Sequence, residues 1–450
     1  MTNHSRNDVD MLHGPLLIKI LTFALPLAAS SVLQQLFNSI DVAVVGHFAS
    51  SQALAAAGSN APVISLLINL FLGLSMGANV IISNHIGQND APSIRKAIAT
   101  VALTAIVSGL FLLVLGTSVA RPILEMMDTP DDVLDMAVTY LRIYFLGIPF
   151  LMVFNFGSAI LRSMGDTKRP LYILMVAGVV NTLLNLLLVI KFGMSVAGVA
   201  IATDIANAVS AAMMVYILMH EKEPYRLHPK EMRIEWSELK RMMQIGVPAG
   251  VQGMIFSSSN VLIQAAINGY GSTAIAGSSA ALNFEYYCYF IIAAFDGAAI
   301  SFIGQNYGAG RPERVRRTFW TCMLLGFGCC AAFNALFVWQ QHFFIDLFST
   351  DPSVHEFAGI RMDIVLATQA LACSYEISGA SMRGMGISLL PTILTVFGTC
   401  LLRLAWVYIV DPIHHDFHVL MMAYPISWVL TGVMVVVAFV IKARKRGVWA

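Results

Sequence analysis

The sequence predicts an all-α integral membrane protein with twelve transmembrane helices arranged as two six-helix bundles. The 450-residue chain is 57% hydrophobic and only 12% charged, whereas soluble domains are roughly 45–50% apolar and about 25% charged. Charge-poor segments recur along the whole chain, and about 20 mostly apolar residues are enough for one helix to cross a bilayer. Short motifs also return in the same order in the second half of the chain.

Apolar segments between polar breaks define the predicted helices. They cover residues 16–44, 54–83, 94–116, 133–161, 170–190, 196–219, 240–267, 277–303, 315–339, 357–382, 391–410 and 418–441. The polar start lacks the order of a cleaved leader, so we expect the first helix to stay in the mature protein. The six cysteines lie in apolar stretches without metal-type spacing, and we interpret them as small buried residues.

Lys and Arg indicate the orientation in the membrane. They lie in or next to the N-terminal segment, every second loop and the C-terminal segment, except for Arg121, Arg142, Lys191, Arg361 and Arg403. Cytoplasmic connections carry the positive excess, so we expect both termini to be cytoplasmic in a multi-pass protein of the bacterial inner (cytoplasmic) membrane. An acidic run is expected in an outer loop: Glu125, Asp128, Asp131, Asp132 and Asp135.

A polar stretch at 220–241 is the predicted cytoplasmic linker between an N-lobe (1–219, helices 1–6) and a C-lobe (242–450, helices 7–12). Four matches recur in one order about 220 residues apart, which indicates a duplication. They are Leu161-Arg162-Ser163-Met164-Gly165 with Met382-Arg383-Gly384-Met385-Gly386, Ile86-Gly87-Gln88-Asn89 with Ile303-Gly304-Gln305-Asn306, Ala57-Gly58-Ser59 with Ala276-Gly277-Ser278, and Pro26 with Pro248. Each copy has an even number of helices, so a pseudo-two-fold axis along the membrane normal should relate them, as in transporters built from parallel repeats.

Polar side chains inside the N-lobe helices are the first candidates for function, because such groups are costly in a membrane. One face of the first helix carries Ser31, Gln34, Asn38 and Asp41. This face must contact protein or water, and a helix-packing stripe is the alternative interpretation. In the fifth helix Asn181 and Asn185 share a face, for either ion binding or interhelical hydrogen bonds.

Two neighbouring residues of the sixth helix, Thr203 and Asp204, point about 100° apart, so they cannot both address one point in a regular helix. In the C-lobe, one side of the eighth helix carries Glu285, Tyr289 and Asp296. Glu376 of the tenth helix is the repeat partner of Asn155, and an ion pair with Arg383 is the alternative to a role in substrate binding.

Several function classes find no support in the sequence. No basic stripe is present for nucleic acid, and no Walker-type motif for ATP. The G-x-S-x-G pattern at Gly73-Leu74-Ser75-Met76-Gly77 lies inside an apolar helix, so we interpret it as close helix packing rather than a nucleophile turn. We therefore expect no enzyme activity, no metal and no other cofactor.

The combined motifs resemble the multidrug and toxic compound extrusion (MATE) family over residues from about 12 to 441, and the combination is specific. The matching pieces are Pro26 followed by Asn38-Ser39-Ile40-Asp41 and Gly46, Leu54-Ala55-Ala56-Ala57-Gly58, Leu161-Arg162-Ser163-Met164-Gly165-Asp166-Thr167, Gly198-Val199-Ala200-Ile201-Ala202-Thr203 and Ile303-Gly304-Gln305-Asn306-Tyr307-Gly308-Ala309. They are most similar to a bacterial branch with an N-lobe coupling site.

The resemblance implies a monomeric secondary transporter that exports cationic or amphipathic organic compounds in exchange for H⁺ or Na⁺ by alternating access. By position, it makes Asp41, Asn181 and Thr203 ion-coupling residues, Gln34 and Tyr140 cavity residues, and Pro26 the hinge. The full candidate set adds Asn185 and Asp204 for ion coupling, and Asn38, Asn155, Glu285, Asp296 and Glu376 for substrate binding.

This chain differs from the branch at one position that affects the choice of coupling ion. The branch often has a second acid in the fifth helix where this chain has Asn185, so proton sharing between two acids is in question, and we favour H⁺ over Na⁺. A flippase for lipids or lipid-linked precursors is the alternative. It would need cationic groups in the cleft, but most intramembrane charges here are acidic.

Overall fold

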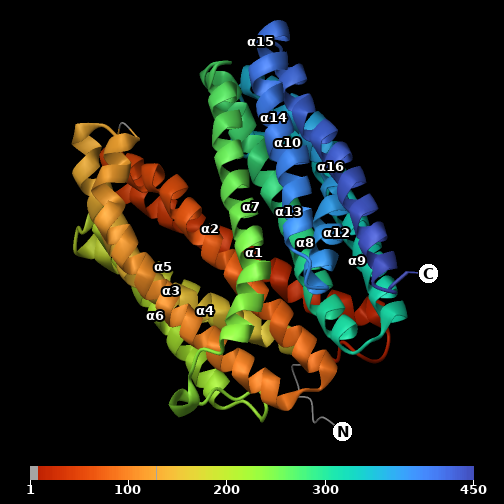
Figure 1. The fold of residues 1–450 in the computed structure, drawn as a ribbon. Helices are drawn as coiled ribbons and strands as arrows, with labels where there is room; N and C mark the ends of the chain where they lie inside the picture. Colours follow the sequence, from red (N-terminus) through yellow and green to blue (C-terminus); the bar gives the residue numbers. More distant parts are fainter. Residues whose placement is uncertain (1–8, 128, 450) are drawn as a thin grey trace. The chain divides into compact units, whose positions relative to one another are not determined.

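The computed structural model describes residues 9–127 and 129–449, apart from the side chains of 51, 54, 55 and 57–59. The described chain is helical almost throughout (Figure 1). The first half contains α1 (Leu16–Phe48), α2 (Ser51–Gln88), α3 (Ala91–Met126), α4 (Asp131–Met164), α5 (Lys168–Asn185) with the π-helical η1 (Leu186–Lys191), α6 (Ser195–Met219) and the short η2 (Pro229–Glu231).

The second half begins with three long helices, α7 (Trp236–Asn268), α8 (Ser272–Gly308) and α9 (Pro312–Trp339), and the short α10 (Gln341–Asp346). Two further segments change helix type along their length. One combines α11 (Pro352–Arg361), η3 (Met362–Leu366), η4 (Gln369–Ala372) and α12 (Cys373–Gly384). The other combines α13 (Leu389–Thr395), η5 (Val396–Leu401), α14 (Leu402–Ala405), η6 (Trp406–Val410) and α15 (Asp411–His414), and α16 (Phe417–Lys445) follows.

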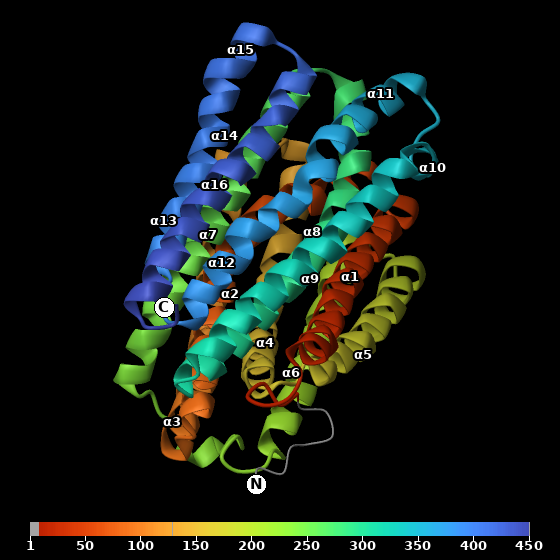
Figure 2. The same ribbon diagram turned by 90° about the vertical axis from the view of Figure 1, so that its right-hand side faces the viewer.

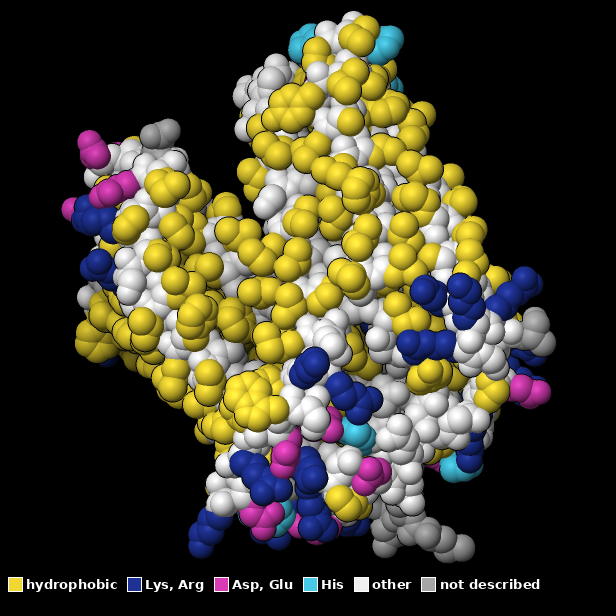
Figure 3. Space-filling view, in the orientation of Figure 1, with side chains coloured by type: hydrophobic (Ala, Val, Ile, Leu, Met, Phe, Trp, Pro, Cys, Tyr) yellow, Lys and Arg dark blue, Asp and Glu magenta, His cyan; other side chains and the backbone are white. Residues whose placement is uncertain are grey.

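The helices form twelve long segments, as predicted. Eleven segments of the described chain are long and apolar enough to span a membrane. The twelfth is α7, which has 33 residues but a more polar composition that includes the run Ser257-Ser258-Ser259-Asn260. The face drawn in Figure 3 agrees with a membrane protein, because hydrophobic side chains cover most of the helices and charged side chains gather near helix ends.

The expected outer acidic loop is wrong in detail. Glu125 lies in the last turn of α3, while Asp131 and Asp135 lie in the first turns of α4. Arg121 of α3 forms ion pairs with both Glu125 and Asp135. These acids therefore belong to the ends of the two helices and not to an open loop. Asp128 lies outside the described residues.

Contacts divide the described chain into two units. The first unit contains Ala29–Gly250 and the described residues before Met11, and the second contains Met11–Ala28 and Val251–Ala450 up to its last described residue. The divisions within α1 and α7 come two residues after Pro26 and Pro248. The units therefore differ from the lobes expected from sequence: the first half of α1 packs with the second half of the chain, and the start of α7 packs with the first half.

Inside the first unit, α4 lies against α2, α3 and α6 (Figures 1 and 2). Glycines allow this close packing: a Cβ at Gly109 of α3 would lie 2.6 Å from Pro149 Cα of α4. A Cβ at Gly157 of α4 would lie 2.3 Å from the Met214 side chain of α6. In the second unit α8 contacts α9, α11 and α12, and α16 packs on α12 (Figure 2).

Gly73 and Gly77, the glycines of the G-x-S-x-G pattern, form the contact between α2 and the start of α7. A Cβ at Gly73 would lie 2.2 Å from the backbone nitrogen of Gly250, and one at Gly77 would lie 2.4 Å from the carbonyl oxygen of Met242. Small residues four apart let two helix backbones approach this closely. The interpretation of the pattern as close helix packing is confirmed.

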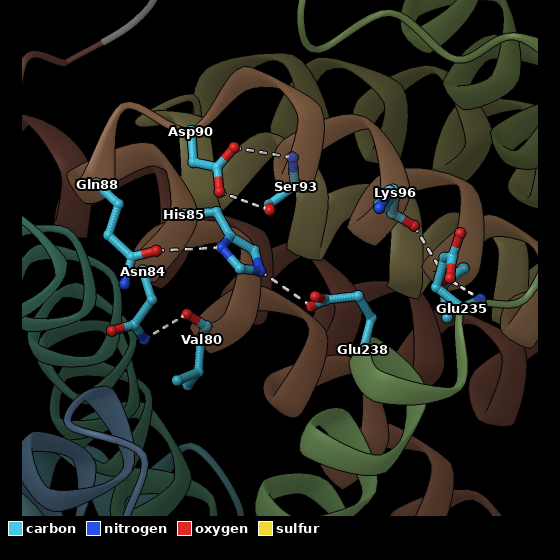
Figure 4. A network of polar contacts seen from close by, with 10 residues as sticks. Val80, Asn84, His85, Gln88, Asp90, Ser93, Lys96, Glu235 and Glu238 are labelled. Carbon is cyan, nitrogen blue, oxygen red and sulfur yellow. Dashed lines mark hydrogen bonds and ion pairs between the residues drawn. The ribbon is translucent and has the colours of Figure 1, made fainter.

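The ends of these two helices are joined by a buried polar network (Figure 4). His85 Nε2 of α2 lies 2.9 Å from Glu238 Oε2 of α7, and both side chains are buried. Asp90 caps the N-terminus of α3 by accepting hydrogen bonds from the backbone N–H and the hydroxyl of Ser93. These hydrogen bonds favour the charged carboxylate and lower the pKa of Asp90 below its ordinary value.

Candidate functional site

The site predicted in the N-lobe depends on a close approach of α1 and α5. Gly178 of α5 leaves room for Phe37 of α1, since a Cβ at this glycine would lie 1.8 Å from the Phe37 ring. Asp41 follows Phe37 by one turn of α1, and Asn181 and Asn185 follow Gly178 on the same side of α5. The contact between Gly178 and Phe37 therefore brings the carboxylate of α1 to the two amides of α5.

A chain of hydrogen bonds links the four residues. Asn185 Nδ2 donates to Asp41 Oδ1 and, over 3.2 Å, to Asn181 Oδ1. Asn181 Nδ2 donates over 3.3 Å to Thr203 Oγ1 of α6, and the Thr203 side chain also contacts the Asp41 carboxylate. Three helices thus contribute one carboxylate, two amides and one hydroxyl to a single cluster.

Burial restricts access of water to this cluster. Asn185 is fully buried and Asn181 is 5% exposed, while Asp41 is partly exposed. Asn185 Oδ1 is buried and accepts no hydrogen bond within the described chain. The π-helical η1 begins directly after Asn185, and single π-helical turns often lie at functional sites. A carboxylate, an unsatisfied amide oxygen and a hydroxyl are groups that can bind a proton or a small hard cation.

Asp204 does not join the cluster, although it is adjacent to Thr203. Its Oδ1 packs against Gly147 of α4, where a Cβ would lie only 2.0 Å from this oxygen. The expectation that Thr203 and Asp204 point to different places is confirmed. Tyr140, two turns before Gly147 on α4, interacts electrostatically with both Asp41 and Asp204 and stacks on Tyr144.

The remaining N-lobe candidates lie on α1 and α4. Gln34 and Asn38 are exposed on the half of α1 that carries Asp41. Asn155 is partly buried on α4, and its amide donates over 2.9 Å to the carbonyl oxygen of Leu151 in its own helix. Pro26 lies inside α1, two residues before the division between the units.

Glu285 of α8 lies in a buried ion pair. Arg361 of α11 donates to both carboxylate oxygens, over 2.5 and 2.9 Å, and to Ser278 Oγ over 2.5 Å. Gln369 donates to the backbone oxygen of Glu285 over 2.9 Å. Because both carboxylate oxygens are engaged, we interpret Glu285 as a structural residue rather than a substrate ligand. The sequence analysis placed Arg361 only by its side of the membrane and missed this pairing.

Asp296 and Glu376 lie together in the second unit with Arg383. Both acids interact electrostatically with this arginine, and Tyr289 hydrogen-bonds to Glu376. Arg383 also donates over 2.7 Å to Gln252 of α7. The ion pair considered for Glu376 and Arg383 is therefore present as an electrostatic interaction, but a second acid shares it. One arginine faces two carboxylates, so the group is acidic when both acids are ionised.

Arg403 is a further buried charge that the sequence analysis did not explain. It is 1% exposed, donates to Ser427 Oγ over 2.9 Å and lies 4.3 Å from the ring centroid of Tyr424 and 5.7 Å from that of Trp428. Cation–π contacts of this kind stabilise an arginine away from water. The aromatic residues follow one another by four on α16, a spacing that could have indicated the contact. Arg361, Arg383 and Arg403 each have a partner inside the second unit, so the flippase alternative is not favoured.

The repeat found in the sequence agrees with the comparison to known families. The MatE family model matches residues 26–187 and again 248–409. The chain belongs to the MatE family. Its two matches confirm the duplication, and the resemblance to the MATE transporters inferred from the sequence is confirmed with them.

Two curated relatives of this MatE protein come from Bacillus subtilis. The probable multidrug resistance protein YpnP is 29% identical over 68% of this chain and 68% of its own length. The probable multidrug resistance protein YoeA is 26% identical over 83% of this chain and 82% of its own length. A crystal structure of MATE in complex with MaL6 superposes with a TM-score of 0.91 at 18% identity, covering 99% of this chain and all of the other. This likeness confirms the predicted fold of two six-helix halves.

Proposed function

We propose that the protein is a secondary transporter that exports lipophilic organic cations from a bacterial cytoplasm in exchange for H⁺, with Asp41 as the residue that binds the proton. The observation that carries the proposal is the cluster of Asp41, Asn181, Asn185 and Thr203, in which a single carboxylate is enclosed by neutral groups. Membership in the MatE family, a transporter family, supports export as the activity. An intramembrane carboxylate without a cationic partner is typical of proton relays in transporters.

The hydrogen-bond directions favour H⁺ over Na⁺. The amide of Asn185 points its N–H group at Asp41, which stabilises the charged carboxylate but puts a donor where a metal ion would need an oxygen ligand. The Asn181 oxygen is already used by Asn185. A Na⁺ ion would require the Asn185 amide to rotate, whereas a proton needs only one carboxylate oxygen.

Protonation provides a physical link to the movement of α1. A neutral Asp41 is a weaker acceptor for the Asn185 amide than a charged one, so proton binding weakens the contact that joins α1 to α5. The α1 helix contains Pro26, which removes a backbone hydrogen bond and permits bending. In the proposal, the proton and the substrate bind alternative arrangements of α1, and each lowers the affinity for the other.

The preference for cations follows from the remaining acids. In the second unit Asp296 and Glu376 share the single guanidinium of Arg383, and the first unit has a further carboxylate at Asp204. Names of relatives that refer to multidrug resistance support a broad range of organic substrates. Opposite charges on a ligand and in a cavity raise both encounter rate and specificity.

The test is transport by purified protein in proteoliposomes. A pH gradient is imposed while uptake of a fluorescent lipophilic cation into inside-out vesicles is followed, and Asp41→Asn is expected to lower this uptake to the level of protein-free vesicles. Asp132→Asn, an exposed acid at the start of α4, is the matched control and should transport normally. Thermal unfolding of both variants checks that they are folded. Full pH-driven transport by Asp41→Asn would contradict the proposed role.

A second experiment separates the two coupling ions. At equal pH on both sides, a Na⁺ gradient alone is expected to give no accumulation of the cation. Accumulation under these conditions, lost in Asp41→Asn, would replace H⁺ by Na⁺ while leaving the site in place.

A further inference from the structure

A cavity of about 540 Å³ lies in the first unit between the start of α3 and the linker before α7. Its volume is within the range of roughly 300–1,000 Å³ that is typical of small-molecule sites. The linker is anchored on both sides of the cavity. Leu227 is buried and its N–H donates over 2.9 Å to the Leu218 oxygen, while the Glu235 N–H donates over 3.1 Å to Thr100 Oγ1 of α3.

Cationic side chains dominate the lining. They are Arg95, Lys96, Arg226, Lys230 and Arg233, opposed by the single carboxylate of Glu231. Two of the five cations form ion pairs with carboxylates: Arg95 with Glu223 at 3.2 Å and Arg233 with Glu235 at 2.9 Å.

Lys96, Arg226 and Lys230 remain without a carboxylate at ion-pair distance within the part of the chain that is described. Asp90 is in electrostatic range of Lys96, but its oxygens are occupied by Ser93. Figure 4 shows Lys96 on α3, close to the linker residue Glu235. Within the described residues, three cations on this cavity therefore form no ion pair, and Glu231 is the one carboxylate that lines the cavity with them.

The second unit contains an equivalent cavity of about 560 Å³. It lies at the start of α9, which corresponds to α3 in the repeat, and it is closed by Gly14–Leu16, the segment that precedes α1 as the linker precedes α7. Arg314, Arg316 and Arg317 line it together with one acid, Glu313, which lies 3.9 Å from Arg317. The duplication has thus kept a basic cavity at the same place in each half, which argues against a chance gathering of surface charges.

Beyond the first cavity, toward its C-terminal end, α3 carries an apolar stripe. Ala99 lines the cavity, and Leu103, Ile106 and Leu110 follow on the same face, the last two well exposed. Ile106 lies about 16 Å along the helix from Arg95 at 1.5 Å per residue. Basic residues at headgroup depth followed by exposed apolar residues are the arrangement that an anionic phospholipid fits.

We propose that this cavity binds a phosphate group, with Lys96, Arg226 and Lys230 as the residues that hold it. Each supplies several N–H donors for phosphate oxygens, and Arg226 can bind two oxygens at once. An anionic phospholipid or a soluble phosphate compound can supply the group. The apolar stripe on α3 favours the lipid.

Native mass spectrometry of the full-length, delipidated protein tests the proposal. Phosphatidylglycerol and phosphatidylcholine are titrated in parallel, and inorganic phosphate and glycerol 3-phosphate form the soluble arm. We expect phosphatidylglycerol to bind in preference to phosphatidylcholine. The Lys96→Gln/Arg226→Gln/Lys230→Gln variant should weaken that binding about tenfold or more, since each basic residue near an anionic surface contributes measurably.

The matched control is Lys442→Gln/Arg444→Gln/Lys445→Gln, which removes the same charge from the end of α16 in the second unit, from residues that do not line this cavity. It should retain the binding of the unmodified protein. If glycerol 3-phosphate or inorganic phosphate binds equally well and the first variant loses it, the cavity is a phosphate site with a soluble ligand. If both triple variants lose binding equally, or neither does, the proposal is overturned. Asp41→Asn should bind phosphatidylglycerol normally, so failure of the transport proposal leaves this one testable.

Discussion

Glu285 and Arg361 form a buried ion pair in which each charge compensates the other. Glu285→Gln removes one partner and leaves Arg361, which is 2% exposed, without its carboxylate. Breaking such a pair costs about 3–5 kcal/mol, so we expect a large fall in the thermal unfolding temperature. Removing both charges with Glu285→Gln/Arg361→Met should restore part of the loss.

The control for this prediction is Glu125→Gln. Glu125 pairs with Arg121 at 3.4 Å, but both side chains are about half exposed, and exposed pairs contribute only about 0–1 kcal/mol. Equal shifts in the unfolding temperature for Glu285→Gln and Glu125→Gln would show that the buried pair is not needed for stability.

Asp204 and Asp41 should differ in their effect on transport. Asp204 packs against Gly147, outside the hydrogen-bond chain that ends at Asp41. Asp204→Asn is therefore expected to reduce pH-driven uptake less than Asp41→Asn, with its main effect on the apparent affinity for cations. Uptake measured over a range of substrate concentrations separates the two effects. Complete loss in Asp204→Asn, with residual uptake in Asp41→Asn, would reverse the assignment.

The residues of the N-lobe cluster could be predicted because helical spacing alone fixes which side chains share a face. Asn181 and Asn185 are four apart, and they do lie on one face toward Asp41. Pairings between distant helices could not be obtained in this way. Glu285 and Arg361 are 76 residues apart in the sequence, with α9 and α10 between their helices, and no periodicity in either α8 or α11 indicates that they meet.

At the scale of helices, the contact between α2 and α7 depends on glycine. Gly73→Ala would place a Cβ within 2.2 Å of the Gly250 backbone, which cannot rotate away as a side chain can. Overpacking of this kind typically costs about 1–3 kcal/mol. We expect a lower unfolding temperature and reduced transport for Gly73→Ala.

Gly328→Ala is the matched control, since Gly328 lies inside α9 and nothing would lie within 4 Å of its Cβ. The substitution should leave the unfolding temperature unchanged or raise it slightly, because alanine favours the helix by about 1 kcal/mol. A similar fall for both variants would mean that helix propensity, and not the contact with α7, explains the effect of Gly73→Ala.

Helix positions were predictable and helix type was not. Every predicted apolar segment falls within a helix of the structure, because the bilayer requires a minimum apolar length. The changes from α-helix to π-helix at η1, η3, η5 and η6 leave the hydrophobic pattern almost unaltered. A change of this kind depends on how neighbouring side chains pack, which is not visible in one sequence.

For the whole molecule, the distribution of Lys and Arg predicts that both termini and the linker are cytoplasmic. In a variant without the six native cysteines, Lys222→Cys should not react with a membrane-impermeant maleimide in intact cells. Asp132→Cys, exposed at the start of α4, should react. Labelling in the opposite pattern would invert the topology.

The two units could not be derived from the duplication. Self-comparison places the boundary between repeats at the linker, but packing assigns the first half of α1 and the start of α7 to the opposite halves. Sequence similarity shows which segments arose by duplication, whereas the contacts in the structure show which helices pack together. Pro26 and Pro248 are the sequence features closest to these divisions.

This assignment has a consequence for synthesis on the ribosome. Met11–Ala28 are made first, yet their unit is completed only by Val251–Ala450, roughly 220 residues later, a separation that slows folding in general. The first unit can assemble as soon as Gly250 has emerged. The start of α1 must wait in the membrane without its final neighbours until the second half of the chain has been inserted. In a nascent chain halted in the linker, the start of α1 would therefore still lack its packing partners. Chaperones or proteases that recognise unpacked membrane helices could bind it at that stage.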